Sequence, residues 1–168
     1  VSLMRIANRP RRGIGDTSLQ RLVAHAGALG ITLWEAMRDP EEAGVATAGA
    51  RAIRGFRTQM ESLMALAQDA PVDALLEAVL DRSGTIEAYE AERTIEAEGR
   101  IENLEELVGV AAEFDANRAL EGPSEILPLE EFLQAISLYT DQDDLRQDES
   151  KITLMTLHNA KGLEYDAV

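Results

Sequence analysis

Apolar residues recur at helical spacing along almost the whole chain, and this periodicity limits the possible folds more than any other feature. The clearest stretch lies between residues 53 and 67, where the apolar positions are Ile53, Phe56, Met60, Leu63, Met64 and Ala67. A stripe of this kind predicts a long amphipathic helix. Aromatic residues make up only 4% of the chain, so the core must be built mainly from aliphatic side chains and methionine.

Start and stop signals divide this pattern into a series of helices. We expect one helix from Asp16 or Thr17 to Gly30, a short one capped by Thr32, one from Pro71 to Ser83-Gly84, and one that begins at Pro128. The apolar positions between residues 95 and 111 also keep a helical period. Residues 141–150 are strongly polar and acidic, and we expect a loop there.

The two ends of the chain differ from its helical body. Residues 152–157 are apolar and partly β-branched, which is typical of a buried strand. Residues 1–6 read as the middle of an element rather than its beginning. We therefore expect a piece of a longer protein, in which a helical body is flanked by fragments of an α/β domain.

Composition excludes several classes of protein. The chain has no run of 18 apolar residues and no secretory leader, so we expect neither a membrane span nor export, and a cytoplasmic location. It has no cysteine, which excludes a disulfide framework and a thiolate zinc site. Its two histidines lie far apart in the sequence, so we expect no histidine-rich metal site.

Charge is distributed very unevenly along the chain. The net charge is −15, yet residues 1–60 contain 9 arginines and 5 acidic residues. Residues 61–150 contain 5 arginines and 24 acidic residues. A basic end on an acidic body can still contact phosphate, so the net charge does not exclude nucleic acid as a partner.

The basic end contains a glycine-rich turn, Gly13-Ile14-Gly15, that leads directly into a predicted helix. Glycines allow a tight turn and a close approach to another surface. The start of the helix offers unpaired N–H groups and a partial positive charge, which suit a phosphate. Ile14 would anchor the turn in the core. The alternative is an ordinary helix–helix turn beside solvated arginines, and the local pattern alone favours it.

A second candidate site follows the predicted strand at residues 152–157. Thr156, His158, Lys161, Gly162 and Glu164 lie within nine residues at its carboxyl end. Ligands bind beyond the carboxyl ends of strands in open α/β sheets. Ordinary polar residues at a strand end are the alternative, with nearly equal weight.

Three segments resemble one family. The segment TLMTLHNAKGLEYDAV at residues 153–168 resembles the fifth helicase motif of the UvrD/PcrA/Rep DNA helicases of superfamily 1. The segment LMRIANRPRRGIGDTSL at residues 3–19 resembles the passage from the second motor domain, 2A, into the inserted 2B subdomain. Residues 100–107 resemble another 2B signature. Asn159 and Tyr165 depart from the commonest residues of the fifth motif without altering its charges.

The resemblance implies a mainly α fold, a helical 2B-like accessory domain flanked by short stubs of a RecA-like α/β motor domain. Residues 1–8 would be one stub of motor domain 2A, residues 9–149 the 2B-like domain, and residues 150–168 the return to 2A. The parent protein would be an ATP-dependent 3′-to-5′ DNA helicase of repair or replication that uses ATP and Mg²⁺. The fragment itself would hold no catalytic residue, no metal and no bound cofactor.

The resemblance also assigns roles to individual residues. Duplex DNA would contact Arg11, Arg12, Gly13, Ile14, Gly15 and Thr17. Single-stranded DNA would contact Thr156 and His158, nucleotide would contact Gly162 and Glu164, and Lys161 stays unassigned between the two. Besides DNA, the partners would be the rest of the motor and, in addition, repair or transcription proteins or a second copy.

An alternative function belongs to a different class. The acidic body would then bind a partner protein or a second copy of the chain, with little DNA contact. The charge imbalance favours this reading, whereas the glycine-rich turn favours DNA.

The purified 168-residue chain should not hydrolyse ATP. It contains no Gly-x-x-x-x-Gly-Lys-Ser/Thr phosphate loop, and phosphoryl transfer needs a phosphate cradle, metal ligands and a charge-stabilising arginine together. A coupled ATPase assay with magnesium and DNA measures this. Turnover at helicase-like rates would contradict the expectation.

Overall fold

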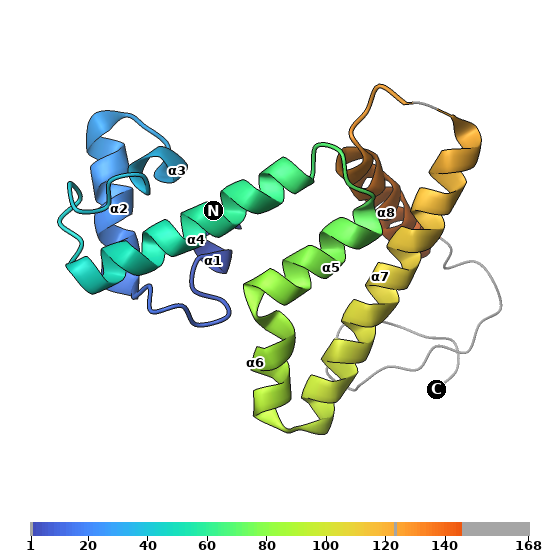
Figure 1. Cartoon of the computed structure of the whole chain (residues 1–168), viewed down its shortest axis with the longest axis horizontal. Helices are drawn as coiled ribbons and strands as arrows, with labels where there is room; N and C mark the ends of the chain where they lie inside the picture. The colour runs from blue at the N-terminus through green and yellow to red at the C-terminus, as the bar shows by residue number, and fades with distance from the viewer. Residues whose placement is uncertain (1, 123, 146–168) are drawn as a thin grey trace. The chain divides into compact units, whose positions relative to one another are not determined.

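The structure, a computed structural model, describes residues 2–122 and 124–145, and these residues fold entirely into helices and their connections (Figure 1). The helices are α1 (Ser2–Ile6), α2 (Asp16–Leu29), α3 (Leu33–Ala36), α4 (Thr47–Leu66), α5 (Val72–Ser83), α6 (Thr85–Glu92), α7 (Ile95–Glu121) and α8 (Pro128–Leu145). The predicted mainly α fold is confirmed for this part of the chain, which holds no strand. The predicted strand at residues 152–157 lies outside it.

The chain divides into two compact units, residues 1–133 and residues 134–168. The packing, the contacts and the candidate site reported below all belong to the first unit. Of the second unit, the structure describes residues 134–145, which form the later part of α8. None of the helices in the described ranges is both long and apolar enough to cross a membrane.

Several predicted helix boundaries are confirmed. Gly30 ends α2 and Gly84 ends α5, each in the left-handed backbone conformation that glycine adopts without strain. Thr32 caps α3 as predicted, because its hydroxyl accepts from the N–H of Glu35 while the Glu35 carboxylate accepts from the N–H of Thr32. That backbone hydrogen bond lowers the pKa of the Glu35 carboxyl below its ordinary value.

Other boundaries differ from the prediction. Gly15, rather than Asp16 or Thr17, is the residue that precedes α2, and Pro71 precedes α5 instead of beginning it. Residues 141–145 were expected in a loop but continue α8 to Leu145. Their polarity suggested a loop, yet the stretch from residue 129 to residue 145 holds neither glycine nor proline to interrupt a helix.

One hydrophobic core joins the first four helices. Its buried members come from helices α2 to α4 and from the segments that precede or connect them, with small side chains prominent among them: Ala7, Ile14, Leu19, Leu22, Ala26, Ala36, Met37, Val45, Ala50, Ile53 and Phe56. Residues 2–8, expected to be a stub of a motor domain, pack on this core through Leu3 and Ala7. Their assignment to a motor domain stays a prediction.

The remaining helices of the first unit pack around α7. Helix α7 lies alongside α5 and α6 (Figure 1), and Ala97 and Ala111 are its buried residues. At its far end the Phe114 ring meets the Phe132 ring edge to face, with 5.3 Å between centroids. The Arg118 guanidinium there pairs with the Glu131 carboxylate at 2.8 Å. These contacts join α7 to the beginning of α8.

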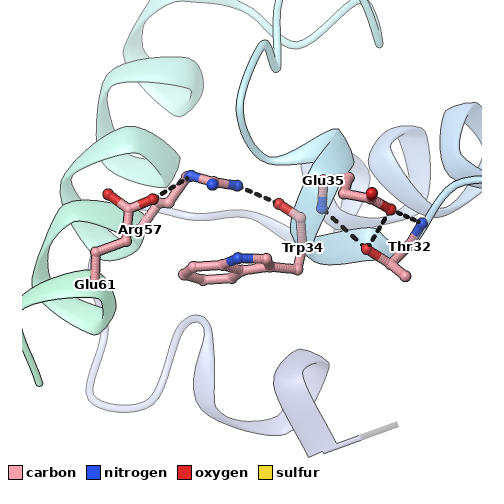
Figure 2. A network of polar contacts seen from close by, with 5 residues as sticks. All are labelled: Thr32, Trp34, Glu35, Arg57 and Glu61. Atoms are coloured by element: carbon pink, nitrogen blue, oxygen red, sulfur yellow. Dashed lines mark hydrogen bonds and ion pairs between the residues drawn. The ribbon is translucent and has the colours of Figure 1, made fainter. Parts of the chain in front are cut away.

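A cation over an aromatic ring ties α3 to α4. The Arg57 guanidinium lies 4.5 Å from the centroid of the Trp34 ring and donates to the backbone carbonyl of Trp34 (Figure 2). Its Nε also donates to the Glu61 carboxylate at 2.9 Å. The side chain of Arg57 is only 15% exposed, so these interactions are partly shielded from water.

Arg57→Gln should therefore lower the free energy of unfolding by about 1–3 kcal/mol, since it removes the cation–π contact and the charged donor of the hydrogen bonds to the Trp34 carbonyl and the Glu61 carboxylate. Urea unfolding followed by the fluorescence of Trp34, the single tryptophan of the chain, measures the change. The matched control is Arg54→Gln, which breaks an exposed ion pair with Glu41 and should leave the midpoint nearly unchanged. Equal midpoints for the two variants would contradict the role of Arg57.

Candidate nucleic-acid interface

The two glycines of the GIG turn, residues 13–15, are required for different reasons. Gly13 has a φ of +79°, which side-chain-bearing residues rarely adopt. Gly15 has a φ of −74° and a ψ of 157°, an extended conformation open to any residue, and a Cβ there would meet no atom within 4 Å. The fold itself therefore requires glycine at position 13 but leaves open space at position 15.

The turn is held from the inside by Ile14 and Asn8. The side chain of Ile14 is fully buried in the core, as the sequence predicted for an anchor. The Asn8 side-chain oxygen accepts from the N–H of Arg12 at 2.8 Å and from the N–H of Ile14 at 3.2 Å. Because the Ile14 side chain and N–H are both engaged, this residue positions the turn from within.

The start of α2 is open toward the outside of the turn. No side chain caps this helix, and the Gly15 carbonyl accepts from the N–H groups of Ser18 and Leu19. Within the described ranges, the N–H groups of Asp16 and Thr17 have no acceptor. Gly15, Asp16 and Thr17 are all exposed. This end of the helix thus presents free donors and the positive end of the helix dipole, which suit an anion.

The two adjacent arginines have different surroundings. Arg11 is exposed and makes no ion pair or hydrogen bond to any residue that the structure describes. Arg12 is half-buried and donates to three backbone carbonyls, those of Ile6, Pro10 and Ser83. Burial lowers the pKa of the Arg12 guanidinium below its ordinary value, although an arginine stays charged at any physiological pH. Of these two arginines, Arg11 is the one whose charge is free to meet a phosphate.

The sequence analysis missed a second helix start beside the first. A Cβ at Gly49, in the first turn of α4, would lie 3.0 Å from the Ser18 hydroxyl of α2. The start of α4 likewise lacks a side-chain cap and any acidic residue, and Arg51 is exposed near it. The small residues at positions 48–50 were the available signal, since glycine inside a helix often marks close packing.

The predicted sites divide into two groups. The six residues predicted to contact duplex DNA all lie in or beside the GIG turn, where Arg11, Gly13, Gly15 and Thr17 are exposed, Arg12 is half-buried and Ile14 is buried. The five residues predicted to contact single-stranded DNA or nucleotide are Thr156, His158, Lys161, Gly162 and Glu164, and they lie outside the described residues. Their roles stay predictions.

Known proteins resemble this chain over its full length. The sequence model of the UvrD-like helicase C-terminal domain matches residues 1–168. The chain is 36% identical over 174 residues to the ATP-dependent DNA helicase PcrA of Bacillus subtilis, an alignment that covers 100% of this chain and 23% of the relative. It is 36% identical over 165 residues to PcrA of Leuconostoc citreum, which covers 98% of this chain and 22% of the relative.

A third relative gives the same picture. The chain is 32% identical over 168 residues to the ATP-dependent DNA helicase PcrA of Staphylococcus aureus, an alignment that covers 100% of this chain and 22% of the relative. The chain thus spans less than a quarter of the length of these relatives.

Replacement of Asn8 tests how the turn is held. Asn8→Ala leaves the N–H groups of Arg12 and Ile14 without their acceptor and should lower the free energy of unfolding by about 1–3 kcal/mol. Asn8→Asp keeps an oxygen at the same place and should stay close to the parent. Urea unfolding followed by circular dichroism measures both variants. If the aspartate variant is as unstable as the alanine variant, the two hydrogen bonds do not hold the turn.

Proposed function

The chain belongs to the family of UvrD-like helicase C-terminal domains, and we propose that its GIG turn grips the backbone of duplex DNA within a larger ATP-dependent DNA helicase. The observation that carries this proposal is the open space at Gly15 beside an uncapped helix start. Contacts of this kind go to phosphate oxygens and read no sequence. The relatives are named as DNA helicases, and the proposal extends this activity to the larger protein that contains this chain.

Each exposed element of the turn has a function in this proposal. The N–H groups of Asp16 and Thr17 donate to a phosphate that approaches over Gly15, where a side chain would stand in its way. Arg11 adds a positive charge beside the helix start. The carboxylate of Asp16 lies in the same first turn and opposes the phosphate. Few contacts and one opposing charge together predict weak binding.

The proposal extends to the rest of the chain. Residues 9–149 would act as the 2B-like accessory domain, and the flanks at residues 1–8 and 150–168 would belong to motor domain 2A. Thr156 and His158 would contact single-stranded DNA, while Gly162 and Glu164, with Lys161 unassigned, would lie at nucleotide. ATP and Mg²⁺ would be used by the complete protein, which would unwind 3′-to-5′ in repair or replication in the cytoplasm.

Gly15→Val tests the proposal directly. The backbone at position 15 suits valine and the space around it is empty, so the variant should fold. Duplex binding should fall at least about tenfold, because the side chain occupies the place of the phosphate. We expect the parent to bind hairpin duplexes at the weak end of the ordinary non-specific range of dissociation constants, roughly 10⁻⁴–10⁻⁶ M. Fluorescence anisotropy measures binding, and circular dichroism measures folding.

Gly27→Val is the matched control. Gly27 lies near the other end of the same helix, is exposed, and has equally empty space around its Cβ position. This variant should fold and bind duplex as the parent does. If folded Gly15→Val also binds like the parent, the turn only connects two helices, and the acidic protein-interaction or self-association function becomes the better explanation.

A further inference from the structure

Arg12 connects four separate parts of the first unit. One terminal nitrogen, Nη1, donates to the Ile6 carbonyl at the end of α1 at 3.1 Å and to the Pro10 carbonyl at 3.0 Å. The other, Nη2, donates at 3.0 Å to the carbonyl of Ser83, 71 residues along the chain. The guanidinium also lies over the Phe56 ring of α4, 5.5 Å from its centroid. This one side chain thus joins α1, the segment between α1 and the GIG turn, α4 and α5.

The end of α5 is a favourable place for this cation. Ser83 is the last residue of α5, and the final carbonyls of a helix lack partners within the helix and carry its negative end. The Phe56 ring beneath the guanidinium is nearly fully buried in the core. A guanidinium fits both neighbours because it is planar, stacks on a ring and directs separate N–H groups to separate acceptors.

The contacts of Arg12 change what its charge can do. Three carbonyls and a ring face already surround the guanidinium, whereas the neighbouring Arg11 is exposed and has no partner among the described residues. A phosphate would have to compete with these contacts for Arg12 but not for Arg11. The two adjacent arginines therefore differ in function, although the sequence alone assigned them the same one.

We propose that Arg12 is a positioning residue, which fixes the GIG turn against the end of α5 so that Gly15 and the start of α2 are presented to duplex DNA, while Arg11 supplies the phosphate contact. This inference rests on the proposed function for its effect on DNA binding. Its structural half, that Arg12 holds the turn, stands independently of DNA. Without Arg12 only a fraction of molecules has the turn correctly placed, and the apparent affinity falls to that fraction of its full value.

The decisive variant is Arg12→Lys, compared with Arg12→Gln and Arg11→Gln. Lysine keeps the charge but not the planar fork that reaches two sides at once. A contact between this charge and a phosphate would survive the substitution, whereas the hydrogen bonds to three carbonyls would not. Arg11→Gln is the matched control, because it removes the adjacent charge from a side chain that holds nothing together.

Amide hydrogen exchange provides a readout without DNA. In both Arg12 variants the N–H groups of Ile14 and Gly84, on the two sides of the connection, should exchange about tenfold faster or more. Amides in the middle of α7 should keep the parent's rates, which shows that the change is local. Arg11→Gln should alter none of these rates. Parent-like protection of Ile14 and Gly84 in Arg12→Lys would overturn the positioning role, whatever the DNA result.

The salt dependence of duplex binding provides the second readout. Arg11→Gln should reduce the slope of log affinity against log salt concentration by about 0.9, the value of one phosphate contact on duplex DNA. Both Arg12 variants should bind about tenfold more weakly than the parent with an unchanged slope. Parent-like affinity in Arg12→Lys together with a reduced slope in Arg12→Gln would overturn the proposal, because it is the signature of a phosphate contact.

The two proposals can fail separately. If Gly15→Val and Arg11→Gln both leave duplex binding unchanged, the DNA-binding function fails, while faster exchange at Ile14 and Gly84 in Arg12→Lys still supports the positioning role. If Gly15→Val abolishes binding while Arg12→Lys matches the parent in exchange and affinity, the function stands and the positioning role fails.

Discussion

The burial of the Ile14 side chain is the constraint on which the arrangement of the N-terminal helices depends. Ile14 belongs to the buried cluster that includes residues of α2, α3 and α4, and Leu3 of α1 packs against the same cluster. Full burial of an isoleucine side chain contributes about 1.5–3 kcal/mol. The hydrophobic effect thus fixes the turn from the inside. Position 15, on the exposed side of the turn, has an ordinary extended backbone and empty space around it, so the fold does not dictate which residue stands there.

Local signals in the sequence were sufficient for much of this region. Some features are determined by residues close together in the chain, and the structure confirms the predictions made for them. They are the glycines that end α2 and α5, the Thr32 cap and the burial of Ile14. The predicted loop at residues 141–150 was wrong for residues 141–145, because polarity alone does not end a helix. A helix ends where a residue interrupts it or where another group competes for its backbone hydrogen bonds.

Contacts between residues far apart in the chain could not be predicted from the sequence. The sequence around Arg12 does not indicate that Ser83 will lie beside it. Likewise, the sequence around Trp34 does not indicate that the Arg57 guanidinium will lie over its ring. A pattern of basic residues shows how much charge is present but not where each side chain is directed. The same limit applies to the start of α4, since its closeness to α2 follows from the packing of two helices and not from either helix alone.

The contact between Gly49 and Ser18 has a consequence for how this sequence can change over time. The two positions share one small volume with Val45, since a Cβ at residue 49 would already lie 3.0 Å from the Ser18 hydroxyl and 3.1 Å from the Val45 Cγ1 atom. An alanine at position 49 would be tolerated more readily if position 18 became glycine in the same lineage, so the two sites should show epistasis. A side chain at position 49 would require the Ser18 hydroxyl and the Val45 side chain to shift. The volume shared by positions 18 and 49 therefore limits how closely the positive ends of the two helices can approach each other.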